Sequence, residues 1–180
     1  MTTDLQLSPF SYEATVGHLF SAWNTEHAAF LFAHASPADR KLLLSVEDQY
    51  LVPRASFTSR SPFHFELNHE VQAHVIKEAH DRRCCLVEVH SHPFPALACF
   101  SPTDVTGLLE WVVHVRWRLQ DRPYAALVVS PGSFDALVFS DKSSARPTVL
   151  NTLMVGATRL HPTGTTAQNW EVLADGRKTF

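Results

Sequence analysis

One short stretch of the chain, residues 84–104 (CCLVEVHSHPFPALACFSPTD), constrains the fold more than any other part of the sequence. Its first part is apolar and β-branched, which predicts a buried strand over residues 84–89. Two prolines then end the strand and predict a loop. The Ser-Pro-Thr-Asp sequence at 101–104 has the residue order of a helix start, and helical apolar spacing continues from there to about residue 120.

Three side chains of this stretch have the chemistry and the spacing of metal ligands. His90 and His92 leave the predicted strand on the same face, because side chains alternate along a strand. Asp104 stands at the start of the following helix, which can return to the strand end. Two imidazoles and one carboxylate form the ligand set of a catalytic zinc ion and leave one position open for water. The pattern predicts a Zn²⁺ site and metal-assisted hydrolysis.

Simpler explanations exist for each part of the pattern. Ser101 and Asp104 also form a capping box, which occurs wherever helices begin. A histidine pair is weak evidence by itself in a chain with eleven histidines, although no second His-x-His pair is present. The order of the two parts, first the pair at a strand end and then the Ser-x-x-Asp helix start, favours the metal site.

This combination of residues resembles a known signature. His90-Ser91-His92-Pro93, followed by Ser101-Pro102-Thr103-Asp104, is similar to the motif of the JAMM (MPN-plus, JAB-domain) zinc metalloproteases, and the Phe-Ser-x-Thr-Asp ending resembles bacterial members. The intervening loop, 94–100, is one residue longer than the commonest form. Outside the motif the resemblance is one of element order over about residues 10–140. It implies an α/β (α+β) fold, with a mixed sheet flanked by helices on a cytidine-deaminase-like plan.

The resemblance also implies catalytic residues. The family places a glutamate at the start of the first core strand as the general base, and Glu26 occupies that place here. Glu47 and Glu88 are alternatives, the first expected in a hairpin or loop and the second near the metal or beside one of its ligands. An ordinary exposed acid is the simpler interpretation of Glu26. The family role of Ser101 is to donate a hydrogen bond to the developing oxyanion.

The substrate implied by the resemblance is a ubiquitin-like protein. A bacterial member of this type would hydrolyse the bond after the C-terminal glycine of the modifier, in deconjugation or precursor processing. Its partners would include cognate activating and conjugating enzymes, for instance in antiphage defence. Processing of a sulfur-carrier protein and a non-catalytic scaffold are the alternatives. The loops at 53–63 and 140–146 are candidate walls for a groove that holds the extended substrate tail.

Composition limits the setting of the chain. With 180 residues, of which 45% are apolar, we expect one globular domain over 1–180, its core at about 10–140 and a C-terminal extension at 141–180. The net charge of −3 gives no reason to expect nucleic-acid binding, and no apolar run is long enough for a membrane span. Without a secretion signal or a disulfide framework, the cytoplasm is the expected location. Cys99, beside the metal loop, is expected to pack rather than to bind metal.

The remaining pattern predicts alternating helices and strands. The first helix, over 11–23, should turn Leu19 and Trp23 toward the core. Other expected elements are a helix at 66–80, strands at 28–33, 42–44, 50–52, 124–129, 136–139, 149–155 and 170–173, turns at 37–39 and 131–132, a loop at 57–63 and a linker at 143–147.

Overall fold

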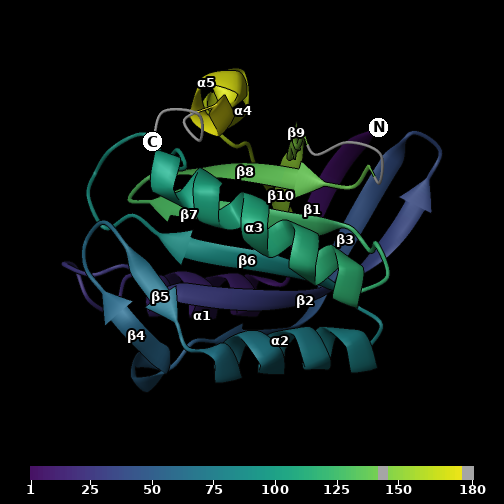
Figure 1. The fold of residues 1–180 in the computed structure, drawn as a ribbon. Coiled ribbons are helices and arrows are strands. Elements are labelled where there is room, and N and C mark those ends of the chain that lie inside the picture. The colour runs from purple at the N-terminus through teal and green to yellow at the C-terminus, as the bar shows by residue number, and fades with distance from the viewer. Residues whose placement is uncertain (142–145, 176–180) are drawn as a thin grey trace.

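A nine-stranded mixed sheet with helices on both faces forms the centre of the computed structural model, which describes residues 1–141 and 146–175 (Figure 1). The strand order is β11-β10-β1-β3-β2-β6-β7-β8-β9. The strands are β1 (Thr2–Leu7), β2 (Ala28–Ala38), β3 (Lys41–Leu51), β6 (Cys85–Ser91), β7 (Tyr124–Ser130), β8 (Ser133–Phe139), β9 (Thr148–Val149), β10 (Thr152–Val155) and β11 (Thr158–Leu160), with β4 (Phe57–Arg60) and β5 (Phe65–Leu67) in a separate hairpin. This arrangement confirms the expected α+β class.

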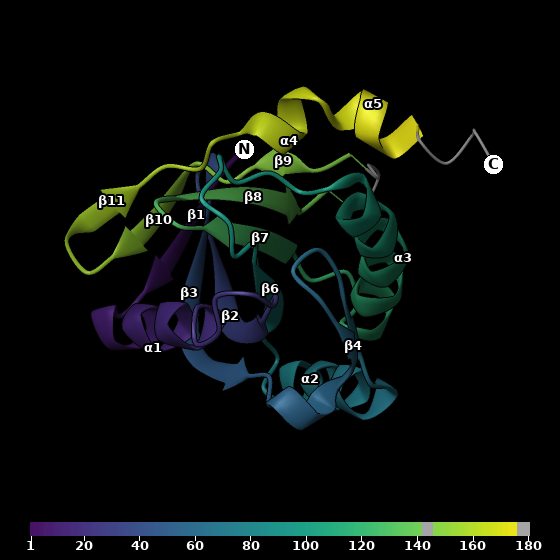
Figure 2. The ribbon, with the colours of Figure 1, turned by 90° about the vertical axis from the view of Figure 1, so that its left-hand side faces the viewer.

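The helices cover the two faces of the sheet unequally. Helix α1 (Pro9–Leu19) lies on one face, whereas α2 (His69–Asp81) and α3 (Pro102–Arg118) lie on the other (Figure 2). The central strand β6 sends alternate residues into both layers, with Leu86 toward α2 and α3 and Val87 toward α1. Because both of its faces are buried, β6 has the almost continuous apolar sequence from which a strand was predicted.

The N-terminal part of the chain differs from the prediction. Residues 2–7 form β1, which pairs in parallel with both β3 and β10 and was not predicted. The first helix begins at Pro9 after the N-cap Ser8 and ends at Leu19, so its predicted extension to residue 23 is wrong. Leu19 is buried as expected, but Trp23 is 80% exposed because the chain leaves the helix four residues earlier.

Strands β2 and β3 form a hairpin longer than the sequence pattern indicates. Both run through eleven residues, and the turn lies at Asp39 and Arg40 rather than at 37–39. The backbone of Asp39 has a φ of 52°, which is compatible with a tight turn. Glu47, which we expected in a hairpin or loop, lies inside β3, the second strand of this hairpin. There the register shifts, since Phe32 pairs with Asp48 and Ala33 with Val46, so Glu47 is the extra residue of a β-bulge.

The region before α2 also contains more regular structure than predicted. Residues 57–60 form β4, although 57–63 was expected to be a loop, and β4 pairs with β5. Helix α2 starts at His69 after the N-cap Asn68, whose side chain accepts a hydrogen bond from the Val71 N–H. The predicted start at residue 66 is therefore too early, because residues 66 and 67 belong to β5, which pairs with β4.

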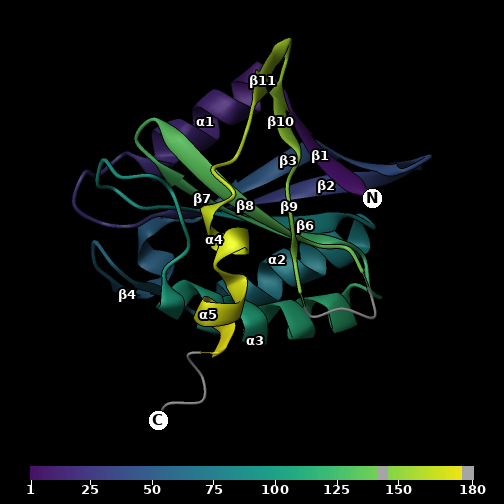
Figure 3. The same ribbon diagram turned by 90° about the horizontal axis from the view of Figure 1, so that it is seen from above.

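Residues 148–160 add strands to the central sheet, and residues 165–175 form short helices. Strand β10 pairs with β1 and β9 pairs with β8, which splits the predicted strand at 149–155 in two. Residues 170–173 lie in helix α5 (Trp170–Asp175), not in a strand, and α5 contacts α3 (Figure 3). Before it, the buried Asp135 carboxylate accepts hydrogen bonds from residues of α4 (Thr165–Gln168) and its N-cap. The predicted linker at 143–147 lies largely outside the described residues.

Among the helices of the described residues, none combines the length and the apolar character needed to cross a membrane.

Candidate metal centre

The C-terminal end of β6 carries His90, and His92 follows directly after the last residue of the strand. His90 pairs with Ala28 of β2 on one side and with Val128 of β7 on the other, so its backbone lies in the middle of the sheet. His90 is only 2% exposed, and its ring packs between the rings of Phe65 and Phe100. His92 follows one step along the same face, with its ring centroid 5.2 Å from that of His90. Strand pairing therefore holds the two imidazoles side by side.

Helix α3 brings the carboxylate to these two rings. Asp104 Oδ2 lies 3.2 Å from His92 Nε2 and 3.8 Å from His90 Nε2. The ligand atoms of the three residues all lie within 4.8 Å of one another. In a tetrahedral zinc site with bonds of about 2.0–2.2 Å, such atoms are roughly 3–4 Å apart. The spacing is close to that of a metal site.

The same carboxylate caps the helix. Asp104 Oδ2 accepts a hydrogen bond of 2.7 Å from the Ser101 N–H, and the Asp104 N–H donates one of 3.1 Å to Ser101 Oγ. The predicted capping box is therefore present, with Ser101 as the N-cap. The capping and ligand interpretations of Asp104 are compatible, because the capping bonds hold the carboxylate where it faces both histidines.

Several buried polar atoms at this centre have no hydrogen-bond partner within the described parts of the chain, which indicates whether a cation fits here. Among the described residues, neither ring nitrogen of His90 has a hydrogen-bond partner, and Glu26 Oε2 has none either. Each such buried group costs about 1–3 kcal/mol when it stays unpaired. Burial acts to raise the pKa of Asp104, but the His90 and His92 rings and the Ser101 N–H outweigh it and hold the pKa far below its usual range. Unpaired nitrogens around an ionised carboxylate fit a divalent cation.

Glu26 reaches the same centre from the start of β2. It lies two residues before the strand, and its N–H donates a hydrogen bond of 3.0 Å to the Ser61 carbonyl. The residue is 1% exposed, so it is not the ordinary exposed acid of the simpler interpretation. Its Oε1 atom is 3.7 Å from His92 Nε2, and burial raises the pKa of its carboxyl. A buried carboxyl with a raised pKa is suited to carry a proton.

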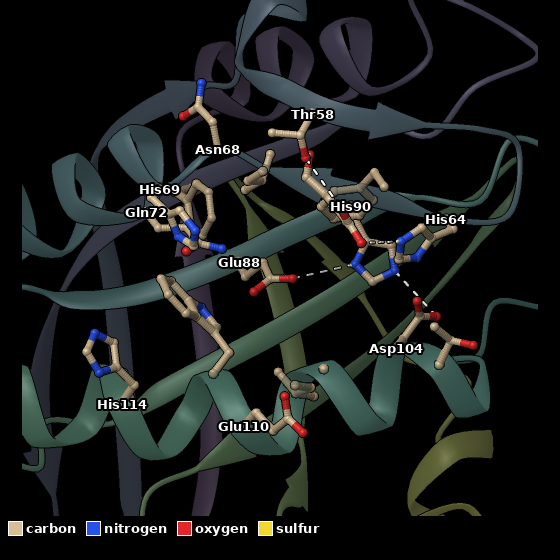
Figure 4. A pocket seen from close by; sticks show the side chains of 18 of the residues that line it. Thr58, His64, Asn68, His69, Gln72, Glu88, His90, Asp104, Glu110 and His114 are labelled. Carbon is tan, nitrogen blue, oxygen red and sulfur yellow. Dashed lines mark hydrogen bonds and ion pairs between the residues drawn. The ribbon is translucent and has the colours of Figure 1, made fainter.

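The two alternative glutamates have different positions. Glu88 shares the face of His90, and its Oε1 lies 3.9 Å from His90 Nδ1 (Figure 4). Its Oε2 accepts a hydrogen bond of 2.5 Å from the Tyr124 hydroxyl, and burial raises the pKa of Glu88. Glu88 thus lies next to Nδ1 of His90, whereas Nε2 of the same ring is near Asp104. Glu47 is remote from the centre and binds His34 instead.

Sequence reasoning assigned no role to the aromatic residues that support the centre. Phe65 and Phe100 enclose the His90 ring, and Tyr124 holds Glu88. Tyr124 reaches Glu88 because it pairs with Leu86, two residues earlier in β6. No local pattern signals this contact, since it depends on the register of β6 against β7.

A pocket of about 830 Å³ lies next to the centre, between α2, α3 and the β4–β5 hairpin (Figure 4). His90 and Asp104 line one end, and Trp111 and His114 of α3 also line it. Thr58 belongs to the predicted groove wall at 53–63 and lines the pocket. Most of the other predicted wall, 140–146, lies outside the described residues. The pocket has room for an extended peptide segment or a large side chain.

Cys99 is not part of the ligand group that the described residues form. It is half-buried, and burial raises the pKa of its thiol, which keeps the sulfur protonated.

No family model matches the chain, and no curated protein matches it either. The function is therefore argued from the motif and the geometry.

Proposed function

We propose that this chain is a zinc-dependent peptidase or isopeptidase of the JAMM (MPN-plus) type. The observation that carries the proposal is the convergence of His90, His92 and Asp104 within 4.8 Å, with the buried Glu26 carboxyl beside them. The mixed sheet flanked by helices is compatible with the MPN plan, in which the strand end and the following helix supply the ligands.

His90, His92 and Asp104 would hold the metal. When bound, zinc supplies Lewis acidity, which polarises a carbonyl group and acidifies water. His90 would use Nε2, the nitrogen nearer to Asp104, and direct Nδ1–H toward the Glu88 carboxylate. The centre is open on the His92 side, since that side chain is 23% exposed whereas His90 is buried.

Glu26 would move the proton in the reaction. Its carboxylate, within reach of His92, takes a proton from the attacking water and then delivers it to the leaving amine. Burial raises the pKa of this carboxyl, which favours its protonated form. Exclusion of bulk water around Glu26 keeps the proton available for the leaving group.

Ser101 would stabilise the charge that develops on the substrate carbonyl oxygen. Its Oγ accepts the Asp104 N–H, so its own hydrogen is free to be donated elsewhere. The backbone cap fixes the position of this hydroxyl without consuming its donor capacity. A donor held in this way acts as an oxyanion-hole group.

We propose that the substrate is the extended C-terminal tail of a ubiquitin-like protein that ends in glycine, joined to a lysine or to a following peptide. The pocket beside the centre and the adjacent β4–β5 hairpin supply room and an exposed backbone edge for such a tail. Cognate activating and conjugating enzymes are the partners that this activity implies, and a bacterial conjugation system is the expected setting.

The test is cleavage of a ubiquitin-like fusion that ends in Gly-Gly, with and without a chelator. Cleavage after the second glycine that stops with chelator and returns with zinc would support the proposal. Cleavage that the chelator leaves unchanged would exclude the mechanism. Absence of bound zinc from the purified chain would instead indicate a non-catalytic scaffold.

A further inference from the structure

A second group of metal-binding side chains lies at the other end of the central strands. The β2–β6 pairing runs from Ala28 and His90, at the candidate metal centre, to Ala33 and Cys85. Just beyond that far end, His34, Glu47 and Cys84 place an imidazole nitrogen, a carboxylate oxygen and a thiol sulfur within 4.8 Å of one another. They come from β2, from β3 and from the residue before β6. The proposed peptidase function uses none of them.

The distances within this group resemble those of a tetrahedral zinc site. Glu47 Oε2 is 2.8 Å from His34 Nε2, and Glu47 Oε1 is 3.3 Å from Cys84 Sγ. The ring nitrogens of His34 are 3.9 Å from the same sulfur. Nitrogen, oxygen and sulfur ligands of one zinc ion lie roughly 3–4 Å apart, given bonds of about 2.0–2.3 Å. Small side-chain movements would suffice to bind the ion.

The bulge in β3 gives this group its carboxylate. Val46 packs in the core on the α1 side, whereas Tyr50 packs on the α2 side. An unbroken strand would turn these residues to the same face, so the extra residue reverses the alternation. As a result, Glu47 and its neighbour Asp48 both face the α2 side, where Arg82 contacts both of them.

The two carboxylates then have different partners. Arg82 donates hydrogen bonds of 2.7 Å to both Asp48 and Glu78, but its nearest approach to Glu47 is 3.7 Å. The guanidinium thus neutralises chiefly the other two acids and leaves the Glu47 carboxylate to face His34 and Cys84.

We propose that His34, Glu47 and Cys84 form a second zinc site, independent of the candidate catalytic centre. The buried sulfur is its inner ligand, and water completes the coordination on the side where His34 and Glu47 are 51% and 37% exposed. Because thiolate, imidazole and carboxylate ligands together suit zinc, we expect Zn²⁺ to be the bound ion. The bound ion ties β2 and β3 to the start of β6, and so stabilises the sheet at this end.

Cobalt(II) in place of zinc gives a direct test. A thiolate ligand produces a sulfur-to-cobalt charge-transfer band in the near ultraviolet, whereas the His90, His92 and Asp104 centre has only nitrogen and oxygen ligands. We expect the band in the full-length protein and its disappearance on addition of zinc. It should persist in His92→Ala, which disrupts the other centre, and in Cys85→Ser and Cys99→Ser, which remove the other thiols.

Cys84→Ser and His34→Ala are the deciding variants. Cys84→Ser should lose the band and one equivalent of tightly bound metal. His34→Ala should lose that equivalent too, and it removes a half-exposed side chain, so the fold should survive the substitution. Circular dichroism checks the fold of each variant. Absence of the band from the unmodified protein, or its unchanged intensity in either variant, would overturn the second site.

Discussion

Nε2 of His92 lies 3.7 Å from Oε1 of Glu26, although the two residues belong to distant parts of the chain. Their proximity continues the antiparallel pairing of β2 with β6, in which Ala28 is opposite His90. Beyond this pair, the Ser91 N–H donates to the His27 carbonyl and the His27 N–H donates to Ser91 Oγ. The sheet therefore aligns the proposed general base with the proposed metal ligand.

Glu26→Gln should lower turnover of the Gly-Gly fusion by about 10²–10⁴, the range for general acid–base groups, and leave zinc content unchanged. The amide keeps the volume of the side chain but cannot carry the proton. Turnover and bound zinc would be measured on the same preparation. Glu13→Gln, at an exposed position of α1, is the matched control and should keep full activity. Full activity of Glu26→Gln would assign the proton transfer to another group.

Glu88→Gln should weaken zinc binding by about 10–100-fold, because the carboxylate behind His90 orients the ring and increases its basicity. Competition with a chromophoric chelator measures this affinity. Tyr124→Phe removes the hydroxyl that holds Glu88 and should have a smaller effect in the same direction. Equal affinity in the Glu88 variant and the unmodified protein would show that Glu88 only fills space.

Ser101→Ala and Ser101→Gly separate the two roles of the Ser101 side chain. Both substitutions remove the hydroxyl and should lower turnover by about 10²–10³ if it stabilises the oxyanion. Alanine should also cost about 1 kcal/mol of stability as a poor N-cap, whereas glycine should cost only a few tenths. Urea unfolding and turnover would be compared between the two variants. If turnover instead falls only in proportion to the loss of stability, more in Ser101→Ala than in Ser101→Gly, then Ser101 acts as a helix cap alone.

Gly107→Phe should block the pocket without affecting the metal. Gly107 is on α3 and lines the pocket, and a Cβ atom there would meet nothing within 4 Å. The added ring should lower kcat/KM for the fusion while zinc affinity stays the same. Gly107→Ala should keep activity and stabilise α3 by up to about 1 kcal/mol. Gly17→Phe, at an open position on α1, is the control for an added aromatic ring. Unchanged kcat/KM in Gly107→Phe would show that substrate does not use this pocket.

His27 should make the stability depend on pH in mildly acidic solution. Burial, followed by the nearby Arg60 charge, lowers the pKa of His27 from its ordinary value of 6.5 to about 4. The unfolded chain therefore binds more protons than the folded chain between these values, and stability falls as the pH decreases from 6.5 to 4. We expect His27→Gln to reduce the total loss of unfolding free energy between pH 6.5 and 4 by on the order of 1–3 kcal/mol in chelator-treated protein. Urea unfolding over this pH range measures the effect, and identical slopes would contradict it.

Part of the fold and of the candidate site follows from local sequence alone. The buried strand β6, the proline-containing loop and the capped start of α3 depend on side-chain alternation, proline geometry and one capping box. These interactions join residues close together in the chain, so their sequence signal is complete within residues 84–104. The same signal identifies His90, His92 and Asp104 as neighbours.

Tertiary structure alone decided the rest. Strand β1 is built by parallel pairing with β3 and β10, and α5 forms where Trp170 packs on the core, so neither has a complete local signal. The bulge at Glu47, the Tyr124 contact with Glu88 and the pocket all depend on how separate strands align. Register between distant strands is set by the summed packing of both faces of the sheet, which no short stretch of sequence contains.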